Sequence, residues 1–113
     1  MSPPRVILEM GAGTDLHGRD YTKAAVRAVK DALQHSSLSF IRTLGLDPAA
    51  MQVDVTIGVQ QPEDIDPAPI MAAFPHGTIN VRVVHGGLDV PDDERDDVAV
   101  IASAAIEVRM ALR

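Results

Sequence analysis

Hydrophobic residues occupy every second position from Met51 to Val59, and the positions between them are polar or glycine. A period of two is typical of a strand with one buried face. Shorter stretches of the same alternation predict strands at residues 6–10 and 79–83. Residues 98–112 also alternate, although their alanine content favours a helix. We choose a strand there because the polar side chains then share one face.

Hydrophobic residues change to helical spacing from Tyr21 to Gln34, directly after Asp20, which we expect to be the N-cap. The pair Asp66-Pro67 predicts the start of a second, short helix, because proline suits the first helical position. Residues 75–77 are expected to end it. Residues 38–44 suggest one further short helix.

Two stretches are expected to be loops. Residues 11–18 contain three glycines, which suit neither a helix nor a strand interior, and residues 92–97 carry five acids and are interpreted as a solvated turn. The order of elements is then β-α-β-α-β-β. This order predicts an α+β fold with one domain over residues 1–113, in which residues 1–4 form a disordered tip. The sheet is expected to be mixed and four-stranded, with helices on one face.

The composition narrows the functional classes. The chain has 113 residues, 46% of them hydrophobic, with no cysteine and a net charge of -6. These values fit a single aliphatic domain and exclude disulfides and thiolate catalysis. The acidic balance argues against nucleic-acid binding, and no apolar run suggests a membrane span. Without a signal-peptide pattern, the expected location is the cytoplasm.

The densest chemical cluster is the segment Gly11-x-Gly13-x-Asp15-x-His17-Gly18. A dinucleotide-binding loop is excluded, because the third glycine of that fingerprint would fall at Leu16 and no acidic residue ends the next strand. A metal-free polar pocket is one remaining interpretation. Asp15 would orient His17, and His17 would act as an acid or base.

Further residues are candidates for this pocket. A second glycine-rich segment after a strand contains His85, and Lys23 lies at the start of the predicted helix. Backbone amides at glycines can approach an anionic or carbonyl oxygen. We therefore expect Asp15 and His17 to be catalytic, and the candidate ligand-binding residues are Gly11, Gly13, Gly18, Lys23, His85, Gly86 and Gly87.

A metal site is the second interpretation. Asp15 and His17 are two residues apart and suit zinc or manganese, with His85 as the best third ligand. In a purely structural interpretation, Asp15 shapes a turn through backbone hydrogen bonds and His17 is an ordinary loop residue.

The segment 11–18, with the stretches 74–77 and 84–90, resembles a family of conserved hypothetical proteins of bacteria and plant plastids. The family's signature is G-x-G-x-D-x-H-G near the N-terminus. Its order of elements resembles monofunctional chorismate mutase and the C-terminal domain of tubulin-like GTPases. This likeness implies a chorismate-mutase-like fold and favours a trimer.

The opening Gly11-x-Gly13-x-Asp15-x-His17 is also similar to that of the cyclodiphosphate synthase of isoprenoid biosynthesis. The Asp and His of that enzyme's motif bind a divalent metal, so the resemblance implies a metal-binding role for Asp15 and His17.

We expect the second face of the sheet to be semi-apolar and to be hidden by association, so that the protein is a homo-oligomer. The main functional expectation is an enzyme acting on a small polar metabolite, with Asp15 and His17 as its acid–base pair near a subunit interface. The alternatives are the divalent-metal site and a non-catalytic ligand-binding or structural module.

Overall fold

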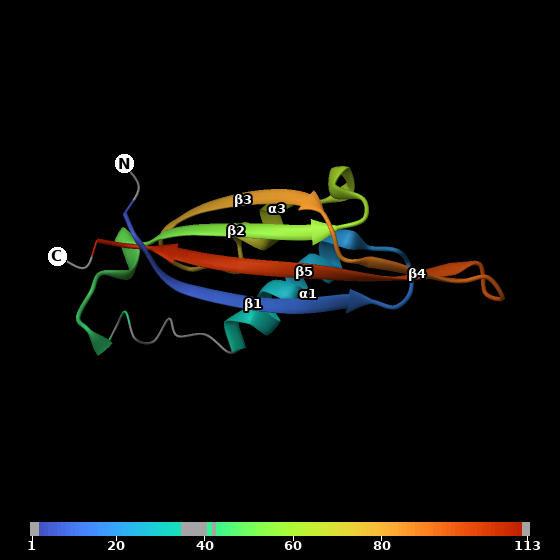
Figure 1. Cartoon of the computed structure of the whole chain (residues 1–113), viewed down its shortest axis with the longest axis horizontal. Helices are drawn as coiled ribbons and strands as arrows, with labels where there is room; N and C mark the ends of the chain where they lie inside the picture. The colour runs from blue at the N-terminus through green and yellow to red at the C-terminus, as the bar shows by residue number, and fades with distance from the viewer. Residues whose placement is uncertain (1–2, 35–40, 42, 112–113) are drawn as a thin grey trace.

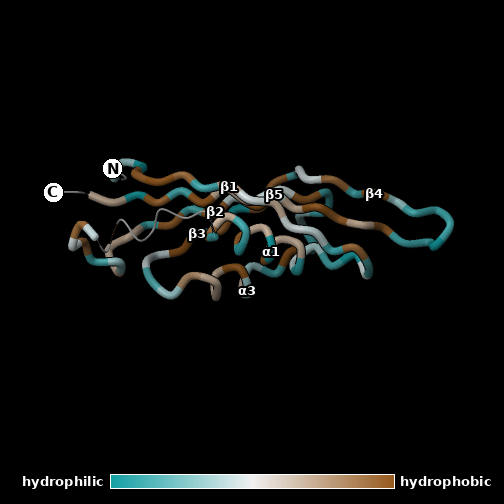
Figure 2. Tube along the Cα trace, turned by 90° about the horizontal axis from the view of Figure 1, so that it is seen from below, coloured by the Kyte–Doolittle hydropathy of each residue, from teal (hydrophilic) through white to brown (hydrophobic). Residues whose placement is uncertain are grey.

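The computed structural model describes residues 3–34, 41 and 43–111. These residues form one five-stranded mixed sheet whose helices lie on one face (Figures 1 and 2). In chain order the elements are β1 (Arg5–Asp15), α1 (Tyr21–Gln34), β2 (Gln52–Val59), α3 (Pro67–Met71), β3 (Thr78–His85), β4 (Leu88–Asp92) and β5 (Asp97–Arg109), with 3-10 turns at Pro48–Ala50 and Pro62–Asp64. The predicted α+β class is confirmed, although the sheet has five strands rather than four.

The longest strand, β5, lies at the centre of the sheet. On one side it pairs antiparallel with β1 over nearly its whole length, from Asp15↔Val100 to Arg5↔Arg109. On its other side it pairs first with β4 and then with β2. The outer strand β3 pairs with β2 in parallel, which fits the connection through α3. The strand predicted at residues 98–112 is therefore β5, the central strand of the sheet.

Strand β4 is the element that the sequence prediction missed. It has five residues, includes Pro91, and pairs only with β5 among the described strands. A proline is tolerated there because β4 is an edge strand. Together β4 and the start of β5 form a hairpin, here called the arm, which extends beyond the other strands in Figure 1. Residues 93–96 form its turn, whereas Asp92 and Asp97, the ends of the expected turn, belong to β4 and β5.

Helix α1 lies unusually close to β1, and this corrects the expected loop at residues 11–18. Gly11 and Gly13 are inside β1, not in a loop. A Cβ built on Gly13 would lie 2.3 Å from Ala24 O and Ala28 N. A Cβ on Gly11 would lie 2.5 Å from Ala32 N. The two glycines therefore give the helix backbone room to contact the strand, and weak strand propensity is overridden by packing.

The same helix covers the free edge of β1. Asp31 Oδ2 accepts a hydrogen bond from Ala12 N–H at 3.0 Å, and Arg27 Nη1 donates to Thr14 C=O at 2.6 Å. An exposed strand edge invites pairing with another chain. These side chains occupy part of that edge, so α1 both packs on β1 and protects it.

The remaining local predictions have clear outcomes. Helix α1 has the predicted bounds, and Asp20 caps it through Lys23 N–H at 3.0 Å. Asp66 caps α3, which ends at Met71, before the predicted stop. The expected helix at residues 38–44 falls mostly outside the described residues.

Pro4, which was expected to belong to a disordered tip, contacts the end of β5. The carbonyl of Pro4 accepts a hydrogen bond from Met110 N–H at 3.1 Å, so Pro4 is held against the end of β5. Residues 1–2 lie outside the described part. No helix among the described residues is long and apolar enough to cross a membrane.

Replacing Gly13 with alanine tests the close packing of α1. The new methyl group has no space against the helix backbone, so we expect the free energy of unfolding to fall by about 3 kcal/mol. Urea denaturation followed by circular dichroism measures this loss. Thr14→Ala, at the next and exposed position of β1, is the matched control. A Gly13→Ala variant as stable as this control would contradict the packing argument.

Candidate functional site

The sheet face without helices, here called the open face, carries a groove of about 610 Å³. Cross-strand pairing sets its centre. Ala12, Ser103, Gly58 and Val84 lie side by side on β1, β5, β2 and β3. The neighbouring row runs from Met10 through Ala105 and Thr56 to Arg82. All of these except Arg82 line the groove.

The groove exists because its floor is made of small side chains. Ala12, Gly58, Ser103 and Ala105 leave the centre of the face low, whereas Met10 stands at its border and is 68% exposed. Other large apolar side chains are exposed on the same face: Leu8, Val84, Leu88 and Val90. Large contiguous apolar patches often mark interaction or ligand sites, which makes this face a candidate.

Four predicted ligand-binding residues line this groove: Gly11, His85, Gly86 and Gly87. Gly86 and Gly87 carry the chain from β3 across the end of β2 to β4. The crossing is tight, because a Cβ on Gly87 would lie 2.1 Å from Ile101 O. Gly86 N–H already donates to Val59 O at 2.9 Å. The expectation that Gly86 offers this amide to a ligand is therefore wrong.

Asp15 is buried, with 3% of its surface exposed, and it shapes the β1–α1 turn. Its Oδ2 accepts a hydrogen bond from Asp20 N–H at 2.9 Å. Its Oδ1 lies 3.8 Å from both Lys23 Nζ and Arg27 Nη1. These contacts match the structural interpretation of Asp15. A paired and buried carboxylate of this kind holds the turn together.

His17 does not pair with Asp15 as predicted; it pairs with Asp97, the residue that follows the turn of the arm. The Nδ1 and Asp97 Oδ2 atoms are 2.9 Å apart. Hydrogen bonds from His17, Val98 N–H and Gly18 N–H lower the pKa of the Asp97 carboxyl, so Asp97 is ionised near neutral pH and Nδ1 carries the proton. His17 and Asp97 together line a recess of about 240 Å³.

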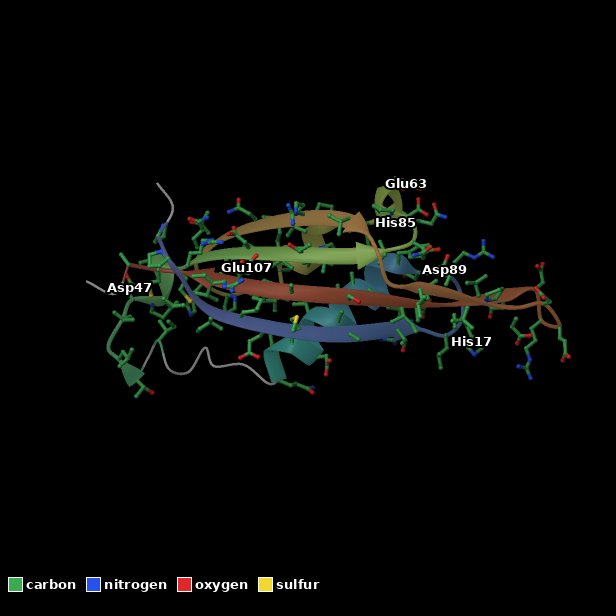
Figure 3. The ribbon with its side chains drawn as sticks, viewed as in Figure 1. His17, Asp47, Glu63, His85, Asp89 and Glu107 are labelled. Atoms are coloured by element: carbon green, nitrogen blue, oxygen red, sulfur yellow. The ribbon has the colours of Figure 1, made fainter. Side chains whose placement is uncertain are left out.

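The predicted metal ligands do not come together. His17 lies near the arm and His85 lies at the end of β3 (Figure 3), while Asp15 is held by the β1–α1 turn. Within the described ranges, no group of three His, Cys, Asp or Glu side chains could hold a metal ion. These residues therefore do not fit a zinc or manganese centre in this chain.

The other predicted residues are placed on the helix side or in the turn. Gly13 contacts α1, and Gly18 takes a φ of 95°, which favours glycine. Lys23 borders a separate hollow of about 430 Å³ along α1. None of these three side chains or backbones lines the groove on the open face.

A buried pair ties α1 to the arm. Tyr21 O–H donates to Asp89 Oδ2 at 2.6 Å, and burial together with this bond raises the pKa of Tyr21 to about 12. The second oxygen, Asp89 Oδ1, is buried without a hydrogen-bond partner in the described part of the chain. The pair fixes the start of β4 over the first turn of α1.

Sequence reasoning missed Thr56 and Ala105 as groove residues. Their signal was present in the strand alternation, which places them on the polar or small face of β2 and β5. Asp97 was missed because it belongs to the acidic run, where single residues do not stand out. The antiparallel pairing of β1 with β5, which places Asp15 opposite Val100, brings His17 to Asp97.

A one-sided α+β sheet with an extended hairpin is the class that this geometry defines. The chain belongs to the conserved hypothetical protein family Lin0512_fam, whose model matches residues 5–108. The expected family membership is thus confirmed. A solved structure from Nostoc punctiforme PCC 73102, described as an FtsZ-like protein of unknown function, is 35% identical, with a TM-score of 0.85. The match covers 97% of this chain and 98% of that chain. No curated protein matches.

Removing the imidazole of His17 tests the pair with Asp97. In His17→Ala we expect the pKa of Asp97 to rise toward its ordinary value of 3.8, because the hydrogen bond from His17, which lowers this pKa most, is lost. The lowered pKa stabilises the folded state above about pH 4, and this contribution disappears as the pH falls through the folded-state pKa. Carbon NMR titration of the Asp97 carboxyl measures the shift. His76→Ala is the control, and an unchanged Asp97 pKa in His17→Ala would exclude the pair.

Proposed function

We propose that the protein binds a small, largely apolar molecule in the groove of the open face, without turning it over. The groove of about 610 Å³ carries this proposal. Sites for small molecules are typically about 300–1,000 Å³, mostly apolar, with a few polar groups that orient the ligand. The Ser103 and Thr56 hydroxyls are the polar side chains of the open face that line this groove. His85 also lines it, but its pairing partner Val59 is buried on the helix face.

The spacing of these polar groups favours binding over nucleophilic catalysis. Ser103 pairs with Gly58, and Gly58 pairs with Val84, the residue before His85. The hydroxyl and the imidazole therefore belong to strands with β2 between them, about 10 Å apart at the backbone. A nucleophile and its base need hydrogen-bond contact. Ser103 instead suits a hydrogen bond that orients a bound molecule.

We also propose that a second copy of the chain covers the apolar border of the groove. Leu88 and Val90 on the arm are 59% and 49% exposed, and Met10 lies farther along the same face. Association would remove this surface from water and enclose a ligand that one chain alone leaves open. The resemblance to chorismate mutase favours three copies.

The groove is tested by filling it. In a thermal-shift screen of a metabolite library, a ligand at a hundredfold its Kd stabilises the folded state by about 2.7 kcal/mol, which raises the Tm by on the order of 10 °C. We expect Ser103→Leu to abolish the shift, because leucine occupies the floor. Thr78→Leu makes a similar change on β3 outside the groove and should keep it.

Mass spectrometry of the ligand separates binding from catalysis. An unchanged ligand after incubation supports the proposal, whereas a new product would establish the enzyme instead. A library without any hit, or hits that Ser103→Leu retains, would refute the groove as the binding site.

Light scattering after gel filtration tests the association. We expect the wild-type mass to be a multiple of 12.0 kDa and Leu88→Asp to be monomeric, because a carboxylate cannot be buried unpaired at the interface. Met71→Asp changes an exposed residue on α3, on the helix side, and should leave the mass unchanged. A monomeric wild-type protein would contradict the association while leaving the groove untouched.

A further inference from the structure

Arg82 stands beside the groove on the open face. It is exposed on β3, and its pairing partner on β2 is Thr56, which lines the groove. Among the described residues, Arg82 makes no ion pair or side-chain hydrogen bond. An unpaired guanidinium next to an apolar hollow is therefore available to a ligand.

The neighbouring charges on this face neutralise one another and leave Arg82 out. Arg109 Nε lies 3.2 Å from Asp54 Oδ2, and Asn80 donates to Asp54 Oδ1 at 3.2 Å. Glu107 Oε2 lies 3.2 Å from Arg5 and 3.4 Å from Arg109. Two arginines thus balance two carboxylates, and both oxygens of Asp54 are occupied.

The charge of Arg82 is unusual for its surroundings. The protein as a whole carries a net charge of -6, yet the network beside the groove sums to zero and Arg82 adds one positive charge. A guanidinium binds carboxylate, sulfonate and phosphate groups through paired hydrogen bonds. An apolar hollow with one cation at its side is complementary to a molecule with an apolar body and an anionic end.

We propose that the ligand of the groove is such an amphipathic anion: its apolar body lies over Ala12, Ser103 and Ala105, and its anionic end binds Arg82. This inference rests on the proposed function and specifies its ligand class. His85 lines the groove from the end of β3, three residues farther along the same strand. Arg82 would thus favour ligands with an anionic group, and the small side chains of the groove floor would favour ligands with an apolar body.

Two dyes with the same body separate these contributions. 8-Anilinonaphthalene-1-sulfonate carries an anionic group, and N-phenyl-1-naphthylamine has the same rings without it. We expect Arg82→Gln to weaken the Kd of the sulfonate about tenfold, as measured by fluorescence titration, and to leave the neutral dye unchanged. Arg95→Gln removes the same charge at the arm and should alter neither Kd. Ser103→Leu should weaken both dyes.

The outcomes distinguish the two proposals. If neither dye binds the wild-type protein, the groove is not a ligand site and the proposed function fails. If both dyes bind and Ser103→Leu weakens both, the groove stands. An equal response of both dyes to Arg82→Gln, or an equal effect of Arg95→Gln, then overturns the role of Arg82. If Arg82→Gln loses self-association while both Kd values stay unchanged, Arg82 contacts the second copy of the chain rather than the ligand. This outcome also overturns the proposed role of Arg82.

Competition identifies the anionic end. Octanoate, octyl phosphate and octanol share an apolar chain, and each is titrated against the bound sulfonate dye. We expect either anion to displace the dye at least about tenfold better than octanol, and this preference should disappear in Arg82→Gln. The better of the two anions distinguishes a carboxylate ligand from a phosphate ligand. Equal displacement by octanol would overturn the proposal.

Discussion

The contact between the α1 backbone and β1 constrains the rest of this structure. Gly11 and Gly13 carry no side chain, and the helix opposes them with Ala24, Ala28 and Ala32, which are fully buried. This approach leaves no room for a ligand or a side chain between helix and strand. Because α1 and α3 occupy the same face, the other face of the sheet has no cover within the described part of the chain.

The central strand β5 organises the candidate site on this one-sided sheet. On the side away from β1, β5 pairs with β4 before Ala102 and with β2 after it. The chain passes over the end of β2 at Gly86 and Gly87 to reach β4. The crossing lies at one end of the groove and fixes the arm to the sheet. Tyr21 and Asp89 hold the other side of the same junction, so that the arm and α1 are positioned together.

The parts of the fold that the sequence predicts well are those in which one local pattern dominates. Alternation in β2 and helical spacing in α1 gave correct elements, because burial there agrees with local propensity. The glycines of β1 were misinterpreted because they make room for the backbone of α1, and this tertiary contact leaves no local pattern in the sequence. Strand β4 is short and contains Pro91, and no local pattern marks it as paired.

The candidate site shows the same division. His17 was recognised as chemically important, but its carboxylate was sought two residues away in the sequence. Its partner Asp97 lies 80 residues away in the sequence, at the start of β5. Long-range strand pairing determines this contact, and sequence spacing carries no information about it. The buried Asp15, by contrast, was available to a local interpretation, since its hydrogen bond to Asp20 N–H is made within the turn.

Small side chains on both faces of β1 and β5 distinguish a built groove from a by-product of helix packing. The approach of α1 requires small residues only on the helix face, at Gly11, Gly13 and their neighbours on β5. It places no demand on the alternate positions, where Met10 shows that a large side chain is accommodated. Ala12, Ser103 and Ala105 nevertheless stay small and forgo the packing that β-branched residues would give a sheet. Their small size therefore needs a cause on the open face itself, and the bound molecule that we propose would supply one.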